Sequence, residues 1–123
     1  MNGNKFLLDT NIILYIISGD KTIATYLHRK DIYISVISEI ELFGFQKLTQ
    51  SEEKQIRAFL SEFRLVQLDE AVKNEAISLR KKYNLRLPDC IIAASAITWN
   101  LTFITADKQF KQIDKLSLEI YEP

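Results

Sequence analysis

Apolar residues follow two patterns in this chain, and the two patterns alternate along its length. Short apolar runs, rich in β-branched and aromatic side chains, predict strands. Longer stretches, in which apolar residues recur every three or four positions, predict helices with one buried face. The predicted strands are residues 5–8, 32–35, 65–68, 101–105 and 118–121. The predicted helices are residues 11–18, 22–29 and 36–48, one capped by Ser51, one capped by Asp69, residues 89–100 and a short turn at 108–110.

This alternation is typical of α/β proteins with a mainly parallel sheet between two layers of helices. We therefore predict a three-layer α/β/α sandwich around a central sheet of four or five strands. A chain of 123 residues is long enough to bury one core, so residues 1–123 are expected to form a single domain. The helix at residues 89–100 is apolar or small nearly all round, and we expect Trp99 to lie in the core.

The composition is that of a globular protein, with 47% hydrophobic and 26% charged residues, and excludes a disordered chain. The longest apolar run, residues 12–17, is far shorter than the roughly 18 to 20 residues that span a bilayer. The chain does not begin with the pattern of a signal peptide, and its single cysteine excludes an internal disulfide bond. We therefore expect a cytoplasmic protein without a membrane segment.

The charges balance, with 16 Lys and Arg residues against 16 Asp and Glu residues. A protein that binds nucleic acid through its phosphates by charge alone is expected to be basic overall. Any contact of this chain with nucleic acid therefore needs a local basic patch or a metal ion at the phosphate.

Four acidic residues occupy the positions where α/β proteins bind ligands, beyond the carboxyl ends of the strands. Asp9 and Asp107 follow predicted strands, Asp89 begins a helix, and Glu41 lies within the helix at residues 36–48. Each also has a purely structural interpretation. The aspartates suit helix caps, first turns or tight turns, and Glu41 suits a capping box with Ser38.

Taken together, the four acids indicate a cation site. Four carboxylates at one edge of a sheet repel one another unless a cation neutralises them. The lone His28 and the lone Cys90 supply no zinc-type cluster, and a ligand set made only of oxygen favours Mg²⁺ or Mn²⁺. Such a site suits the hydrolysis of a phosphodiester bond.

Four stretches of the chain resemble the PIN domain, in the order and at the spacing of that family. They are FLLDTNI at residues 6–12, SVISEIELFG at 35–44, PDCIIAA at 88–94 and TADKQF at 105–110. More narrowly, the chain is similar to the VapC-type toxins of bacterial toxin–antitoxin pairs.

This resemblance implies an endoribonuclease that depends on Mg²⁺, with Mn²⁺ as a substitute. It implies that Asp9, Glu41, Asp89 and Asp107 are the catalytic, metal-binding residues and that Asn11 and Thr105 are supporting polar residues. Asp107 either binds the metal directly or supports it through water. The implied partners are an RNA substrate, a VapB-like antitoxin whose C-terminal tail covers the active-site groove, and a second copy of the chain in a homodimer.

Two further features have both a structural and a functional interpretation. The basic residues near the predicted site suit contacts with RNA phosphates, but cations at a helix end are also favoured by the helix dipole. These residues are Arg80, Lys82, Arg86 and Lys108. The apolar run at residues 12–17 carries more apolar surface than one helix face can bury, which suits a dimer or antitoxin interface.

Two alternative functions remain open at this point. Another Mg²⁺-dependent α/β phosphohydrolase also places an aspartate after its first strand, but a dehalogenase-like phosphatase needs a second aspartate where this chain has Asn11. A response-regulator receiver needs an acidic pair beside Asp9, which the chain lacks, although Asp69 follows a predicted strand. A non-catalytic PIN-like module that binds RNA or protein is expected to have lost one or more of the four acids.

Overall fold

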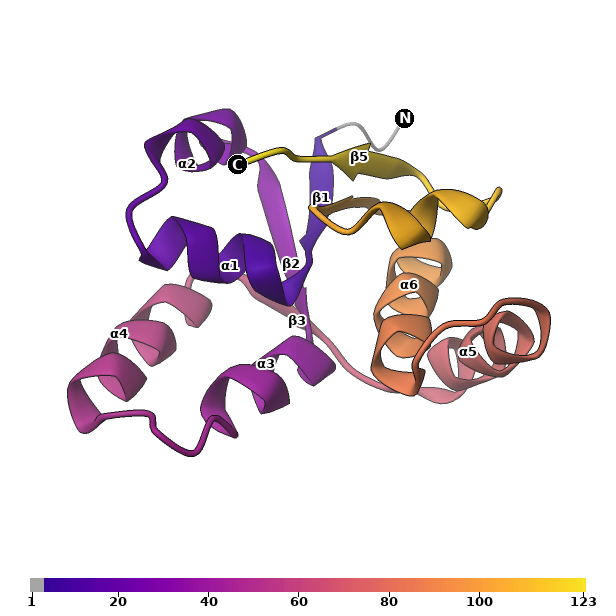
Figure 1. Ribbon diagram of the computed structural model, residues 1–123, viewed down its shortest axis with the longest axis horizontal. Helices are drawn as coiled ribbons and strands as arrows, with labels where there is room; N and C mark the ends of the chain where they lie inside the picture. Colours follow the sequence, from indigo (N-terminus) through magenta and orange to yellow (C-terminus); the bar gives the residue numbers. More distant parts are fainter. Residues whose placement is uncertain (1–3) are drawn as a thin grey trace.

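Five strands form the central sheet of the protein, whose computed structural model describes residues 4–123 (Figure 1). Every neighbouring pair of strands is parallel, which confirms the predicted sheet. The strands lie in the order β3-β2-β1-β4-β5. Their bounds are β1 Lys5–Leu8, β2 Asp31–Ser35, β3 Arg64–Val66, β4 Thr102–Thr105 and β5 Leu118–Ile120.

Helices cover both faces of the sheet, because successive side chains of a strand point to opposite sides. In β1, Leu7 points into the core on one face, and Phe6 and Leu8 point into the core on the other. The first face is covered by α5 (Glu70–Lys82) and α6 (Leu87–Trp99), and the second by α1 (Thr10–Ile17), α2 (Lys21–Leu27) and α4 (Gln50–Leu60) (Figure 1). This arrangement is the predicted three-layer α/β/α sandwich.

Two shorter elements lie at the carboxyl end of the sheet. Helix α3 (Val36–Phe43) follows β2 without a break and contacts both α1 and α6, so it joins the two helical layers. The 3₁₀ helix η1 (Lys108–Gln112) follows β4 and is anchored by Phe110, whose side chain is fully buried. Among residues 4–123, no helix has the length and apolar character needed to cross a membrane.

Three local predictions were wrong. Helix α3 does not extend to residue 48, because it ends at Phe43 with Gly44 as its C-cap. The cap of α4 is Thr49 rather than Ser51, and Thr49 forms a capping box with Glu52. Trp99 is not in the core: it lies in the last turn of α6 with half of its surface exposed.

The strand order places β1 beside β4. From β1 the chain adds β2 and β3 on one side, and then crosses back to add β4 and β5 on the other. Parallel α/β sheets bind ligands beyond the carboxyl ends of the strands where the strand order reverses in this way. The register pairs Leu8 of β1 with Ile104 of β4, and the backbone N–H of Asp9 donates to the Ile104 carbonyl at 3.0 Å. The topology therefore fixes Asp9 beside the end of β4.

Candidate active site

A cavity of about 300 Å³ opens beyond the carboxyl ends of β1 and β4. It brings together all four acids that the sequence singles out, although they come from four separate stretches of the chain. The predicted supporting residue Asn11 also lines it. The lining residues are Asp9, Thr10, Asn11, Glu41, Arg86, Asp89, Asp107 and Gln109.

Asp9 is both the N-cap of α1 and the most buried acid of this cavity, with 8% of its surface exposed. Its Oδ1 accepts from the Thr10 backbone N–H at 2.8 Å, and its Oδ2 accepts from the Thr105 hydroxyl at 2.5 Å. Burial raises the pKa of the Asp9 carboxyl above its usual value, in spite of these two hydrogen bonds, and the charges of Asp89 and Asp107 raise it further. The structural interpretation of Asp9 as a helix cap is therefore confirmed, and the same residue lines the cavity, where its metal-binding role stays a prediction.

Thr105 connects two of the acids. Its side chain is fully buried at the end of β4, where its hydroxyl donates to Asp9 and accepts from the Asp107 backbone N–H at 3.0 Å. The supporting position that the resemblance gave to Thr105 thus corresponds to a direct link between Asp9 and the turn that carries Asp107.

Glu41 faces the cavity from α3 and is held by a hydrogen bond rather than by a capping box. The helix begins at Val36 with Ser35 as its N-cap, so Ser38 is not a cap. Instead, the Thr10 hydroxyl donates to Glu41 Oε1 at 2.7 Å and lies 2.8 Å from the hydroxyl of the buried Ser38. Thr10 therefore ties the start of α1 to α3 across the cavity.

Asp89 lies in the first turn of α6, directly after Pro88, the second residue of this helix. Its pKa is raised, chiefly by burial. The guanidinium of Arg86, 3.7 Å from Asp89 Oδ2, opposes this shift, whereas the charges of Asp107 and Glu41 add to it. The acids of the cavity thus influence one another's protonation through space.

Asp107 caps η1 and shares a neighbour with Asp89. Its Oδ1 accepts from the Gln109 backbone N–H at 3.0 Å, and its Oδ2 accepts from the Gln109 side-chain amide. The same amide nitrogen lies 3.4 Å from Asp89 Oδ2. Sequence reasoning missed the parts that Gln109, Thr10 and Ser38 play in this site. The role of Gln109 could have been found locally, because this residue follows a capping aspartate by two positions. At that spacing its side chain can contact the aspartate.

The four basic residues predicted to contact RNA phosphates lie in different places. Arg86 lines the acidic cavity. Lys108 lies 3.5 Å from a carboxylate oxygen of Glu122 and does not line it. Arg80 donates to the Leu85 backbone carbonyl, in the loop between α5 and α6. Lys82, the last residue of α5, lines a separate cavity.

The donors of the cavity fit a hard divalent cation, because they are carboxylate oxygens with an amide nearby. As the side chains lie, no three Asp, Glu, His or Cys residues within residues 4–123 are grouped closely enough to hold one ion. Mg²⁺ is usually held by only one or two carboxylates and completes its coordination with water and substrate phosphate. Burial is the main reason why the pKa values of Asp9 and Asp89 are raised, and the charges of neighbouring acids, which a cation would neutralise, add to it. The residues therefore fit a Mg²⁺ or Mn²⁺ site.

We expect the affinity of this cavity for Mn²⁺ to fall between pH 7 and pH 5. A carboxyl group with a raised pKa keeps its proton at a higher pH than an ordinary aspartate, and the cation must displace that proton. Binding should therefore be strongest at the upper end of the range and measurably weaker at pH 5. Titrations of Mn²⁺ followed by electron paramagnetic resonance at each pH measure this change. An affinity that stays constant across the range would contradict it.

An apolar groove of about 310 Å³ adjoins the acidic cavity and shares Thr10 and Glu41 with it. Leu14 of α1 and Phe45, just beyond α3, line this groove and are 41% and 61% exposed. The run at residues 12–17 is thus divided, because Ile12 and Ile13 are fully buried while Leu14 faces the groove.

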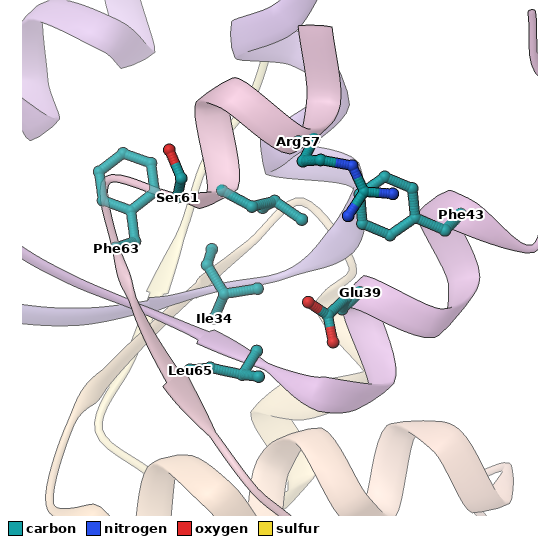
Figure 2. A pocket seen from close by; sticks show the side chains of 8 residues that line it. Ile34, Glu39, Phe43, Arg57, Ser61, Phe63 and Leu65 are labelled. Carbon is teal, nitrogen blue, oxygen red and sulfur yellow. The ribbon is translucent and has the colours of Figure 1, made fainter. Parts of the chain in front are cut away.

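A further cavity lies between α3, α4 and β3, as Figure 2 shows. One acidic residue, Glu39, lines it, and the guanidinium of Arg57 lies over the Phe43 ring, 4.8 Å from its centroid. Isoleucine and leucine side chains form much of its wall. With a single carboxylate, this cavity does not resemble the acidic site.

Comparisons with known proteins agree with this geometry. The model of the PIN domain family matches residues 6–116. Among solved structures, the chain is 31% identical to a chain of a toxin–antitoxin complex from Klebsiella pneumoniae, with a TM-score of 0.77 and coverage of 89% of this chain and 93% of that one.

Two further structures are similar over nearly their whole length. One is VapBC2 from Rickettsia felis bound to a DNA fragment from its promoter, at 25% identity and a TM-score of 0.83, covering 96% of this chain and 99% of that one. The other is VapBC-1 from nontypeable Haemophilus influenzae, at 28% identity and a TM-score of 0.73, covering 94% and 97%. None of the curated protein sequences is significantly similar to the chain. The chain belongs to the PIN domain family, and its similarity to these complexes supports a VapC-type assignment within that family.

Proposed function

We propose that this protein is the toxin of a toxin–antitoxin pair and acts as an endoribonuclease that depends on Mg²⁺, or on Mn²⁺ in its place. The observation that carries the proposal is the convergence of Asp9, Glu41, Asp89 and Asp107 on one cavity in a chain of the PIN domain family. The similarity to VapBC complexes supports the part of a toxin. We place its action in the cytoplasm, where a free cysteine stays reduced.

The residues of the cavity have separate tasks in this proposal. Asp9, Glu41 and Asp89 would hold the cation, and Asp107 would hold it directly or through water. When bound, a divalent cation polarises the phosphoryl oxygen and lowers the pKa of its water. Thr105 and the Thr10 backbone N–H keep Asp9 in place, and the Thr10 hydroxyl keeps Glu41 in place. Rigid positioning of this kind is itself a large part of catalysis.

Arg86 and Asn11 lie at the same cavity and are exposed, so both can meet the substrate. A guanidinium can bind a phosphate oxygen with two hydrogen bonds, which makes Arg86 the residue we assign to the RNA backbone. Its distance of 3.7 Å from Asp89 leaves it free to exchange that weak contact for a phosphate.

The apolar groove beside the cavity is the place we assign to a VapB-like antitoxin. The complexes that resemble this chain are toxin–antitoxin complexes, and the groove shares Thr10 and Glu41 with the acidic cavity. A segment with apolar side chains for Leu14 and Phe45 and a basic side chain for the acids would complement both surfaces. We also propose a homodimer, supported by the exposed apolar side chains of Ile40 and Leu87, which are 60% and 56% exposed.

Incubating the purified chain with an end-labelled pool of RNAs tests the proposed activity. We expect discrete cleavage products with Mg²⁺ or Mn²⁺ and none after EDTA treatment, with activity returning when Mg²⁺ is added in excess. DNA of the same sequences, in a parallel reaction, reports whether the activity is confined to RNA. RNA that is bound but stays intact in every metal would support the non-catalytic alternative instead.

A further inference from the structure

We infer that Gln109 is a positioning residue of the acidic cavity: its side-chain amide holds Asp89 and Asp107 together and competes with a divalent cation for their Oδ2 atoms. This inference rests on the proposed metal-dependent function and assigns part of its control to a residue outside the acidic set.

The contacts of Gln109 join two acids that come from different elements. Its backbone N–H donates to Asp107 Oδ1 at 3.0 Å, and its side-chain Nε2 donates to Asp107 Oδ2. The same Nε2 lies 3.4 Å from Asp89 Oδ2, which makes this the weaker of the two side-chain contacts. One amide therefore spans the gap between the first turn of α6 and the cap of η1.

The backbone of Gln109 is fixed while its side chain can move. The next residue, Phe110, is fully buried, and its ring packs edge-to-face against Phe103 with 4.9 Å between the centroids. Gln109 itself is exposed and lines the acidic cavity. A rotation of its side chain therefore needs no change in the core.

The Gln109 amide and a divalent cation would interact with the same two carboxylates. A primary amide presents two partly positive N–H groups, which attract the Oδ2 atoms that a cation between Asp89 and Asp107 would also attract. A cation between the two Oδ2 atoms takes lone pairs and draws charge that these N–H groups would otherwise use, so the amide and the cation compete. Arg86 faces Asp89 Oδ2 from another side, at 3.7 Å, and is the second group that a cation would displace there.

Replacing Gln109 tests this competition through metal binding rather than through activity. In Gln109→Ala the carboxylates of Asp89 and Asp107 lose the side-chain amide that donates to them. We therefore expect Mn²⁺ to bind about fivefold more tightly. The cation-free protein should melt at a lower temperature than the unsubstituted chain, because the repulsion between Asp89 and Asp107 is then less compensated, and Mn²⁺ should remove this difference. Gln109→Met, which keeps the length of the side chain without its donors, should behave in the same way.

The matched control is Gln112→Ala. Gln112 lies on the same 3₁₀ helix and donates from its side chain to the Gln109 carbonyl at 2.9 Å, but it does not line the cavity. It should leave the affinity for Mn²⁺ unchanged. Equal or weaker Mn²⁺ binding by Gln109→Ala and Gln109→Met would overturn the inference while leaving the proposed function standing. A complete lack of Mn²⁺ binding by the unsubstituted chain would overturn both.

Discussion

Asp9→Asn is expected to lower the rate of RNA cleavage by about a thousandfold or more, while the protein stays folded. Asparagine has nearly the same shape, and its side-chain oxygen can still accept from the Thr10 backbone N–H that caps α1. What it lacks is the negative charge that we expect to hold the cation. Rates measured at saturating Mg²⁺ on one RNA substrate give the size of the loss.

The stability of this variant separates a loss of chemistry from a loss of structure. The Asp9 carboxylate is buried, and its raised pKa shows that its charge is disfavoured there in the cation-free protein. Removing that charge should therefore leave the melting temperature in EDTA equal or higher.

Asp69→Asn is the matched control for Asp9→Asn. Asp69 also caps a helix, accepting from the Val72 backbone N–H at 2.9 Å, but it does not line the acidic cavity. It should retain full activity. If Asp9→Asn cleaves RNA as fast as Asp69→Asn does, Asp9 does not have the assigned role.

Phe110→Ala is expected to lower the free energy of unfolding by about 3–5 kcal/mol. The side chain is fully buried, and its packing against Phe103 is lost together with the volume of the ring. Domains of this size have a total stability of about 5–15 kcal/mol, so the variant should be close to the limit of folding at 37 °C. Urea unfolding followed by circular dichroism measures the loss.

This substitution should also weaken Mn²⁺ binding, because Phe110 anchors the 3₁₀ helix whose cap is Asp107. Phe45→Ala removes a ring that is 61% exposed and should cost less than about 1 kcal/mol. Similar losses for the two variants would contradict the anchoring part given to Phe110.

The sequence was sufficient for the layers of the fold, because the central strands β1, β2 and β4 are largely buried and interrupt the helical pattern clearly. The first strand was predicted to the residue, as Lys5–Leu8. The ends of helices were harder to predict where an apolar pattern continued past them. Phe45 and Leu48 prolong the pattern of α3, yet they follow Gly44 and line the groove beside α1. The apolar character of α6 also did not show that its last turn leaves the core, and Trp99 in that turn is therefore exposed.

Three acids of the candidate site could be predicted because a strand end or a helix start places Asp9, Asp89 and Asp107 locally, and Glu41 could be predicted from its place beside the apolar face of its helix. Their catalytic and metal-binding roles stay predictions. The hydrogen bonds that position them from other elements could not be predicted, since these join residues far apart in the chain. The Thr105 hydroxyl reaches Asp9 over 96 positions, and the Thr10 hydroxyl reaches Glu41 over 31. Such contacts depend on strand order and on the placement of α3, which no local pattern fixes.

We propose that a cation held by these acids contacts the RNA phosphate that is cut. The most direct measurement uses an RNA in which sulfur replaces one nonbridging oxygen at the cleaved phosphate, prepared as separate diastereomers. Mg²⁺ binds sulfur poorly, whereas Mn²⁺ is softer and tolerates it better. We predict that one diastereomer is cut at least about tenfold more slowly than normal RNA in Mg²⁺ and that Mn²⁺ restores its cleavage. Equal cleavage of both diastereomers and of normal RNA in Mg²⁺ would contradict a metal contact at that phosphate.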